Sequence, residues 1–445
     1  MLFMAEIAPM VSKYQSLRPA EVDYLPSLPA HWRIEKGKWL FKKENRPVNQ
    51  DDEVVTCFRD GQVTLRSNRR TEGFTNALLE HGYQGIRKAD LVIHAMDAFA
   101  GAIGVSDSDG KSSPVYAACT PITPKLVNPY FYAYFMRDLA LSGYLISLAK
   151  GIRERSTDFR FKDFGELSLP VFPFEEQSLI VSFLDKKLTK IDGAIQVKES
   201  QIELLKERKQ ILIQQVVTRG LDPYATMRDS GIEWIGEIPE HWEVVFNRRL
   251  FREKSRPVQG DELPLSLSQV DGVIPSGEMT ERSLSPAHRK NFKLCFPGDL
   301  VVNRFKGHLG VFFESAFEGV VTFHYGVFEP QKGVVTKYFE HLFHTEPYKT
   351  IYAGASNGMT VGLQNLSNNN FYAVKSLRPS VDEQTEICRY IEDNSAPLDR
   401  AIKNISSQIE RLKEYKATLI NSAVTGKIKV PGVVEPAEIQ EREFA

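Results

Sequence analysis

Two long stretches of the chain place apolar residues three and four positions apart in alternation, with charged residues at most positions between them. Residues 174–219 form the first stretch and residues 382–425 the second. This spacing is typical of a helix with one narrow apolar face. The apolar positions are Leu188, Ile191, Ile195, Ile202, Leu205, Leu212 and Val216 in the first helix and Leu398, Ile402, Ile405, Ile409, Leu412, Leu419 and Ala423 in the second. Lys209 and Lys416 interrupt the two stripes at matching places.

A stripe this narrow contacts one other helix, and each helix has a matching partner in the same chain. We therefore expect an antiparallel coiled coil, which for about 40 residues at 1.5 Å each is a rod of roughly 60 Å. The residues expected in the contact are Ile195, Ile202, Leu205, Leu212, Ile402, Ile409, Leu412 and Leu419. The alternative is that both helices are ordinary members of a larger bundle.

The helices recur because a large part of the chain recurs. Residues 224–425 resemble residues 14–219. Pro29, His31 and Trp32 return in the same order 210 positions later, and the run IELLKERKQILIQQVVT returns 207 positions later as IERLKEYKATLINSAVT. A large unit that occurs twice predicts a molecule with pseudo-two-fold symmetry. Such a molecule suits a ligand that is itself roughly two-fold, and duplex DNA is the leading candidate.

Outside the helices, short apolar runs punctuated by Pro, Gly and Asn predict globular domains of the α/β or α+β class, of which we expect α+β. Two tandem globular domains separated by long helices are therefore expected. The repeat sets the boundaries: a first mixed domain at 14–173, a central helical spacer at 174–222, a second mixed domain at 223–380, a distal helical spacer at 381–428, and a tail at 429–445 that we expect to be disordered.

The two mixed domains share a few short anchors. In the alignment these anchors pair residues 90–93 with 299–302, 101–105 with 307–311, and 130–131 with 338–339. Between the anchors the two domains differ almost completely. Two copies of one scaffold with unrelated loops predict two different specificities on one plan.

Composition limits this interpretation. The chain carries 56 Lys and Arg against 57 Asp and Glu, a net charge of −1. A protein that holds DNA by charge alone is strongly basic, so local patches or partner subunits would have to neutralise the phosphates. The four cysteines form no CxxC pair, which argues against a metal site or a disulfide framework. Reduced thiols, and the lack of an apolar run of membrane-spanning length, predict a cytoplasmic protein.

Three segments come close to catalytic motifs without matching them. Residues 99–104 have the wrong glycine spacing for a dinucleotide loop, and residues 104–112 place five residues between glycines where a phosphate loop has four. Residues 128–131 lack one proline of the Asn-Pro-Pro-Tyr motif with which adenine methyltransferases hold a flipped base. A Ser/His/Asp triad stays open, because its members need not be adjacent in sequence. No catalytic residue and no metal site is expected in this chain.

Several repeated elements together resemble the specificity subunit of type I restriction–modification systems. They are the Ile-Pro-Glu-His-Trp-Glu run at 238–243, the Glu-Gln pairs at 176–177 and 383–384, Asp192 and Asp399, and the two heptad helices. The resemblance covers about residues 14–428, and its specificity lies in the combination, since each element occurs twice.

The resemblance implies a function for each part of the chain. The mixed domains would be target-recognition domains, each reading one half of a bipartite asymmetric DNA sequence. The helices would set the gap between the half-sites and dock two modification subunits, which methylate adenine with S-adenosylmethionine. Two restriction subunits, with ATP and Mg, would join them. The chain itself would be a noncatalytic specificity subunit.

Base reading requires side chains with fork or amide geometry, in the loops that differ between the repeats. Half of any such set is expected to be ordinary solvated surface. The candidates are Arg66, Arg69, Arg70, Lys150, Arg153, Arg155, Arg160 and Lys162 in the first domain, and Arg304, Lys306, His308, Asn357, Thr360, Gln364 and Asn365 in the second. The alternatives to this function are a stand-alone DNA-modifying enzyme and a coiled-coil scaffold that binds protein only.

Overall fold

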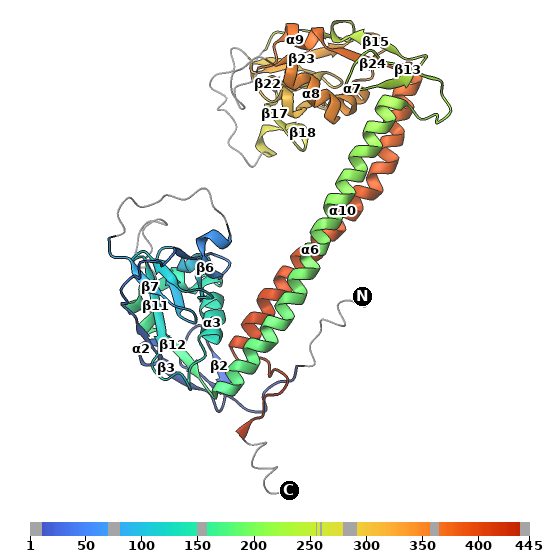
Figure 1. Ribbon diagram of the computed structural model, residues 1–445. Coiled ribbons are helices and arrows are strands. Elements are labelled where there is room, and N and C mark those ends of the chain that lie inside the picture. Colours follow the sequence, from blue (N-terminus) through green and yellow to red (C-terminus); the bar gives the residue numbers. More distant parts are fainter. Residues whose placement is uncertain are drawn as a thin grey trace. The chain divides into compact units, whose positions relative to one another are not determined.

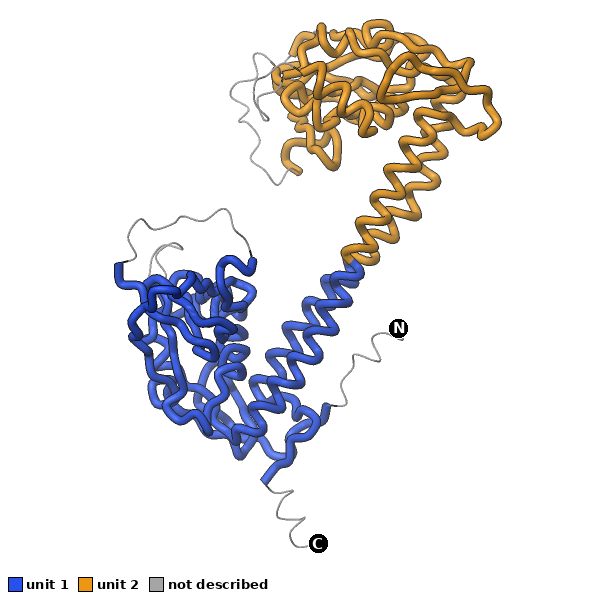
Figure 2. The backbone as a smooth tube through the Cα atoms, viewed as in Figure 1, with its two compact units in different colours: residues 1–198, 407–445 blue, residues 199–406 orange. Residues whose placement is uncertain are grey.

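The computed structural model describes two compact units, each with one mixed domain and half of each long helix. Unit 1 comprises residues 1–198 and 407–445, and unit 2 comprises residues 199–406 (Figure 2). The long helices are α6 (Phe174–Arg219) and α10 (Val381–Val424) (Figure 1). The residues described are 11–69, 81–148, 158–254, 256–258, 260–278, 292–356 and 365–436. None of the helices in these ranges has the length and apolar character needed to cross a membrane.

The two helices pack against each other as the heptads predict, and the antiparallel coiled coil is confirmed. In unit 1, Lys416 Nζ donates to Asp192 Oδ1 at 2.6 Å and Lys198 Nζ donates to Gln408 Oε1 at 2.6 Å. Numbers rise along α6 while they fall along α10, so the helices run in opposite directions. The eight expected contact residues are all buried or half-buried, and Ile409, Leu412 and Leu419 are at most 5% exposed.

The lysines that interrupt the apolar stripes have ionic partners on the facing helix. In unit 2, Lys209 Nζ donates to Asp399 Oδ2 at 2.7 Å. This pair is the repeat of Asp192–Lys416, since both members lie 207 positions apart from their counterparts. The polar breaks in the heptad pattern therefore form two equivalent ion pairs, and such pairs fix the register of a coiled coil.

Unit 1 contains a four-stranded antiparallel sheet in the order β4-β11-β8-β9, with four two-stranded sheets beside it. The short strands and helices follow from the Pro- and Gly-rich sequence, which interrupts every apolar run. Its elements are β1 (Leu17–Pro19), β2 (Ser27–Pro29), β3 (Arg33–Lys36), α2 (Gly37–Leu40), β4 (Phe41–Lys43), β5 (Val55–Cys57), β6 (Val63–Leu65), η1 (Arg66–Asn68), β7 (Gln84–Ile86), β8 (Leu91–His94), η2 (Ala98–Ala100), β9 (Ile103–Val105), β10 (Gly110–Ser112), β11 (Tyr116–Pro121), α3 (Pro129–Leu141), α4 (Tyr144–Leu148), α5 (Phe161–Glu166) and β12 (Ser168–Val171).

Unit 2 repeats this topology, with the four-stranded antiparallel sheet β16-β23-β20-β21 and the same set of two-stranded sheets. The repeat seen in the sequence is therefore a repeat of the fold. Its elements are β13 (Met227–Asp229), β14 (Glu237–Pro239), β15 (Glu243–Phe246), η3 (Asn247–Arg249), β16 (Phe251–Glu253), β17 (Leu265–Ser268), β18 (Gly272–Pro275), η4 (Ser276–Glu278), β19 (Lys293–Cys295), β20 (Leu300–Asn303), η6 (Gly307–Leu309), β21 (Phe312–Glu314), β22 (Gly319–Val321), β23 (Tyr325–Pro330), α7 (Thr336–Phe343), α8 (Glu346–Ala355), α9 (Asn368–Ala373) and β24 (Lys375–Arg378).

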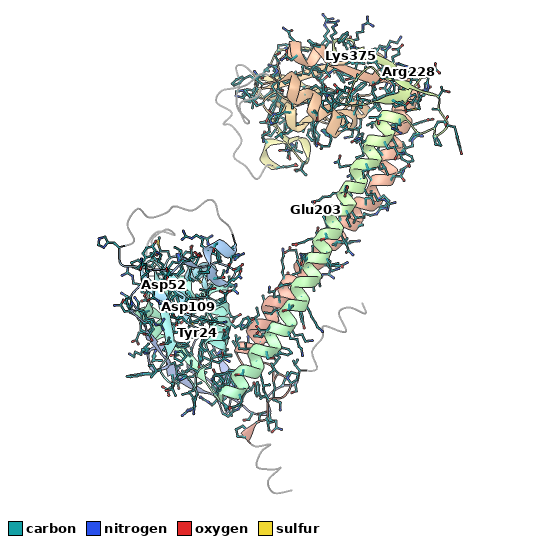
Figure 3. All side chains as sticks on the ribbon, viewed as in Figure 1. Tyr24, Asp52, Asp109, Glu203, Arg228 and Lys375 are labelled. Carbon is teal, nitrogen blue, oxygen red and sulfur yellow. The ribbon has the colours of Figure 1, made fainter. Side chains whose placement is uncertain are left out.

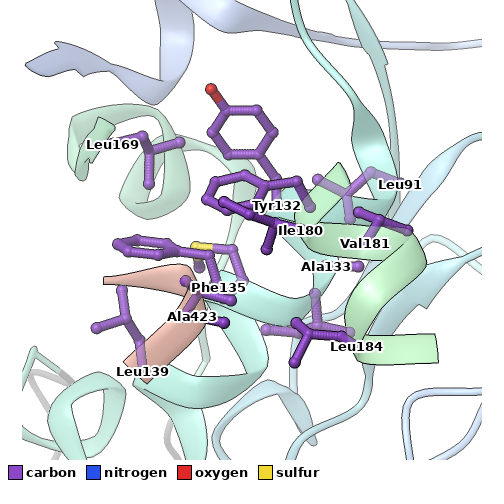
Figure 4. Packing of buried hydrophobic residues seen from close by; sticks show 14 of the residues in the cluster. Leu91, Tyr132, Ala133, Phe135, Leu139, Leu169, Ile180, Val181, Leu184 and Ala423 are labelled. Atoms are coloured by element: carbon purple, nitrogen blue, oxygen red, sulfur yellow. The ribbon is translucent and has the colours of Figure 1, made fainter. Parts of the chain in front are cut away.

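The main core of each unit lies where its mixed domain meets the long helices. In unit 1, Ile180 and Leu184 of α6 and Ala423 of α10 pack against Tyr132 and Phe135 of α3 (Figure 4). In unit 2 the corresponding core takes in side chains from both long helices and from α7. Because each core includes both helices, the mixed domain and its half of the coiled coil form one packed body.

The repeated Pro-x-His-Trp motif anchors each domain to the start of a long helix. Trp32 and Trp242 are at most 1% exposed. The guanidinium of Arg18 donates to the carbonyl of Trp32 at 2.8 Å, and that of Arg228 donates to the carbonyl of Trp242 at 2.6 Å (Arg228 is labelled in Figure 3). The motif is therefore structural in both copies.

The repeated Glu-Gln pair serves the same anchoring purpose. Gln177 Oε1 accepts from the N–H of Asn128 at 2.8 Å, and Gln384 Oε1 accepts from the N–H of Val335 at 2.8 Å. Glu176 accepts from the indole of Trp32 at 3.0 Å. Each pair thus ties the first turn of a long helix to the preceding domain.

Two of the predicted internal alignments are wrong by a few residues. Gly101 and Gly310 both end a 3-10 turn in the left-handed conformation, with φ of 91° and 73°, so Gly101 matches Gly310 and not Gly307. Trp32 contacts the ring of Phe131, as Trp242 contacts that of Tyr338. Phe131 therefore matches Tyr338, one position away from the predicted pairing. Both errors arose because glycine and aromatic residues also occur close to the correctly matching positions.

The prediction of a disordered tail is wrong for residues 429–436. Lys429 forms an antiparallel bridge with Ser12, and Val430 and Val433 belong to the core of unit 1. Glu435 is 4% exposed and accepts from the N–H of Gln15 at 3.1 Å. Buried apolar side chains hold this segment in place, a feature that its polar composition hides.

Candidate nucleic-acid interface

In each mixed domain the central strand ends in a short loop that meets a segment from much later in the domain. In unit 1 the loop follows β8, and the N–H of Phe159 donates to the carbonyl of Ala95 at 2.9 Å. In unit 2 the loop follows β20, and the N–H of Leu366 donates to the carbonyl of Arg304 at 2.9 Å. The two contacts are equivalent, because β8 and β20 occupy the same place in their sheets.

The structure brings four of the second-domain candidates together at this place. Arg304, Lys306 and His308 lie in or beside the turn after β20, and Asn365 precedes the segment that bonds to this loop. Lys306 and Asn365 are exposed, so their polar groups can reach a ligand. Asn357, Thr360 and Gln364 lie outside the described residues.

Arg304 is held by its own domain. Its Nη2 donates to Glu253 Oε1 at 2.8 Å and to Asn368 Oδ1 at 2.6 Å, while its Nε is buried with no hydrogen-bond partner in the part of the chain that the structure describes. Glu253 also accepts from Lys293 Nζ at 2.8 Å. This carboxylate therefore fixes two cations at the strand end, and a fixed guanidinium loses little entropy when it binds.

His308 lies more deeply than its loop position suggests. It is half-buried, and its Nδ1 is buried with no hydrogen-bond partner among the residues described. A side chain in this position contributes to the shape of the turn, and Lys306 is the more accessible of the two for a ligand.

The first-domain candidates that the structure describes lie at two separate places. Arg160 and Lys162 begin α5 and line a hollow of about 1190 Å³. Arg160 pairs with Asp158 and is 69% exposed. The hollow also contains the ion pair Lys38–Glu166, so its charge is of mixed sign. Lys150, Arg153 and Arg155 lie outside the described residues.

The other first-domain group lies around the turn η1. Arg66 Nε donates to Thr56 Oγ1 at 3.3 Å. Arg69 pairs with Asp60 at 2.7 Å and stacks over the ring of Phe58 at 4.3 Å. Both arginines are thus engaged within their own domain, while Arg70 lies outside the described residues.

Sequence reasoning missed three aromatic side chains at the strand ends of unit 2, namely Phe305, Phe323 and His324. Phe305 and Phe323 are 43% and 48% exposed. Phe305 stands between two predicted candidates, Arg304 and Lys306. A search for exposed aromatic residues in the divergent loops, in addition to cations and amides, would have included it.

Two curated proteins are similar to this chain over about two thirds of its length. The first, from Methanocaldococcus jannaschii, is named provisionally as the specificity subunit of the type I restriction enzyme MjaX, and is 24% identical over 68% of this chain and 69% of that protein. The second, the specificity subunit of the type I restriction enzyme EcoKI from Escherichia coli K12, is 24% identical over 70% of this chain and 68% of that protein. No family model matches the sequence.

The fold is similar to a chain in a solved structure that describes complex assembly and conformational transition of the type I restriction–modification system. The TM-score is 0.65, with 13% identity over 89% of this chain and 98% of that chain. The chain is therefore similar in sequence to type I restriction enzyme specificity subunits, and its fold is similar to that of a chain from a type I restriction–modification system. The relatives' names agree with the prediction of a noncatalytic subunit, since a specificity subunit is named separately from the enzyme it serves.

The internal contacts of the two units separate the repeated residues from the candidate readers. The Pro-x-His-Trp, Glu-Gln and Asp–Lys elements make equivalent internal contacts in both units, so they maintain the shared fold. The strand-end loops have equivalent backbones and different side chains, which is the pattern expected of a variable binding surface.

Proposed function

We propose that this chain reads a split, asymmetric double-stranded DNA sequence for a type I restriction–modification complex, with one half-site for each mixed domain. The single observation that supports this best is the repeat. Two copies of one scaffold keep their internal contacts while their exposed strand-end side chains differ. One scaffold with two surfaces is suited to two half-sites of different sequence.

The complex we propose contains two modification subunits and two restriction subunits. S-adenosylmethionine, ATP and Mg would be bound by those partners and not by this chain. Because its own net charge is −1, the partners would supply much of the phosphate neutralisation. A docking role for the helices is supported by Val197, Leu204 and Ile211 of α6, which recur every seventh residue and are 57–64% exposed.

The test is to co-express the chain with its modification subunit in a host that lacks DNA methylation, and to map N6-methyladenine across the genome. The expected result is one motif with two unequal half-sites and a fixed gap. Methylation by the chain without its partner would support a stand-alone enzyme instead. A complex that methylates without sequence preference would contradict a role in specificity.

Substitutions in one unit sharpen the same test. Asn365→Ala should relax the motif at one half-site, whereas Arg160→Ala together with Lys162→Ala should relax it at the other. Each loss should reach about tenfold in relative methylation of the correct sequence, since a good base contact is worth about 1–3 kcal/mol. An equal loss at both half-sites would show that these residues act through assembly and not through reading.

A further inference from the structure

Three aromatic side chains meet on the surface of unit 2 where its central strands end. Phe305 lies in the loop after β20, and Phe323 and His324 lie just before β23. The ring centroids of Phe323 and His324 are 3.8 Å apart, and those of Phe305 and His324 are 5.4 Å apart. We refer to these three side chains as the aromatic patch.

The aromatic patch lies on the surface, although the core of the same unit contains many other aromatic rings. Phe312, Phe339 and Phe343 of the same unit are fully buried, whereas Phe305 and Phe323 are 43% and 48% exposed. Single exposed apolar residues are common, but a cluster of rings in mutual contact on a surface marks an interaction site. Since the rings support one another, their orientation is fixed before any ligand arrives.

Unit 1 carries different chemistry at the same place. The paired strands keep the same register in both units, so Met96 corresponds to Phe305. Pro114 and Val115 correspond to Phe323 and His324. The aromatic patch therefore belongs to unit 2 alone, although the backbone beneath it is shared.

The equivalence of the backbone is close. The turn after each central strand ends in a left-handed glycine, Gly101 or Gly310. The N–H of the next residue donates to the backbone carbonyl of Asp97 in unit 1 and to that of Lys306 in unit 2. The side chain at this position of the turn is acidic in unit 1, where it is Asp97, and basic in unit 2, where it is Lys306.

This difference identifies the occupant. A partner subunit that binds both repeats in the same way would require the same residues in both, and the framework residues show that the chain can keep them. A surface that reads two different half-sites must change. The basic Lys306 beside the rings matches a DNA backbone, and no such charge exists at the equivalent position of unit 1.

We propose that the aromatic patch packs against the C5-methyl group of a thymine in the major groove of the half-site read by unit 2. This inference rests on the proposed function. Thymine alone among the four bases presents an apolar group in that groove, and phenylalanine is among the side chains that contact it. Lys306 then contacts a neighbouring phosphate.

The test measures the binding of the assembled methyltransferase complex, containing the full chain, to duplex oligonucleotides that carry its methylated motif. Each thymine of the unit 2 half-site is replaced in turn by deoxyuridine, which lacks only the methyl group. We expect one replacement to weaken binding by the wild type about fourfold, the value of one buried methyl group. The double variant Phe305→Ala, Phe323→Ala should bind the thymine and uridine duplexes equally.

The control is Met96→Ala, the same position in unit 1, which should keep the full uridine penalty in the unit 2 half-site. Phe305→Leu, which keeps an apolar side chain, should retain part of it. A double variant with the wild-type penalty, or a half-site with no sensitive thymine, would overturn the inference. The inference would also be overturned if the complex bound more tightly to a duplex with an abasic site opposite the sensitive thymine than to the intact duplex, because that result indicates stacking on an extruded base. In each case the wild type still prefers its motif to random DNA, and only the loss of that preference would contradict the proposed function.

Discussion

The two units share one set of framework contacts, but the residues around the start of each long helix are packed differently. In unit 1, Tyr14 is 5% exposed, and its hydroxyl donates to Glu176 at 2.7 Å. In unit 2 the matching residue, Tyr224, is 93% exposed. Glu383, the counterpart of Glu176, accepts from His241 and the indole of Trp242 and lies nearer the surface. One framework therefore has a buried carboxylate in one copy and a partly exposed one in the other.

Chain connectivity explains the difference. In unit 2 the helix α6 runs on directly into β13, so the covalent chain itself joins helix and domain. In unit 1 the matching helix, α10, is followed by residues 427–436, which fill the corresponding place. Val430 and Val433 enter the core there, and Lys429 pairs with the backbone of Ser12. In unit 2 the covalent chain joins the long helix to the mixed domain, whereas in unit 1 the packing of the segment after α10 does so.

Removing the packed segment should have the largest effect and should affect one unit only. Truncation after Gly426 removes two buried valines and the hydrogen bonds of Glu435. We expect unit 1 to lose about 4 kcal/mol of unfolding free energy, since each buried valine contributes about 1.5–3 kcal/mol. Hydrogen–deuterium exchange resolved by peptide, at increasing urea concentration, separates unit 1 from unit 2.

The matched control for this truncation ends the chain after Pro436, which keeps the packed segment. Its exchange should equal that of the full chain. If truncation after Gly426 weakened both units equally, the proposed difference in packing would be wrong.

The carboxylates of Glu176 and Glu383 should contribute different amounts to the unfolding free energy of their units. Glu176→Ala leaves the buried hydroxyl of Tyr14 and the buried indole of Trp32 without their acceptor, and should cost unit 1 about 3 kcal/mol. Glu383→Ala acts at a side chain that is 32% exposed, where water can replace the lost acceptor, and should cost unit 2 about 1 kcal/mol. The same exchange experiment compares them, and equal losses would contradict the assigned roles.

The sequence predicted the helices well because their signal is local and periodic. The heptads located α6 and α10 and their direction. The ionic partners of Lys209 and Lys416 could not be read in the same way, because each partner lies on the facing helix at a register that only packing defines. A break in a stripe shows that a polar residue is present, not what it contacts.

The candidate readers were harder to predict because they depend on sheet register. Phe305 and His324 lie 19 positions apart in the sequence and meet only because β20 pairs with β23. The predicted match of Gly101 with Gly307 also placed the turn three residues away from its true counterpart. Tertiary pairing therefore decides which loop side chains share a surface, and the divergent loops offer no repeat to reveal it.

Acid should distinguish the units next. Burial lowers the pKa of His341 to about 3 and that of His344 to about 4, whereas the matching residues of unit 1, Tyr134 and Arg137, do not gain a proton at mild acidity. Between pH 6.5 and about 4 the unfolded histidines bind protons that the folded ones do not. The stabilisation is therefore complete above pH 6.5 and is lost as the pH falls below it.

Unit 2 should lose about 2 kcal/mol more than unit 1 between pH 7 and pH 5. Burial raises the pKa of Glu314 in unit 2, which works in the opposite direction. Burial also lowers the pKa of His94, which gives unit 1 a loss of the same kind, so the difference between the units is smaller than His341 and His344 alone would give. Urea unfolding at the two pH values, read by unit, measures the difference. His344→Gln, which cannot be protonated there, should remove part of it, and an unchanged pH response in that variant would exclude His344 as the cause.

The smallest expected effect comes from the two equivalent ion pairs of the coiled coil. Asp192→Lys places two like charges together and should cost unit 1 about 1 kcal/mol, because Asp192 and Lys416 are 53% and 33% exposed and partly screened by water. Adding Lys416→Asp reverses the pair and should restore the loss. The same exchange at Lys209 and Asp399 should act on unit 2 alone. Since a reversed pair regains its energy only if the two residues still face each other, recovery measured by urea unfolding also tests the antiparallel register of each half.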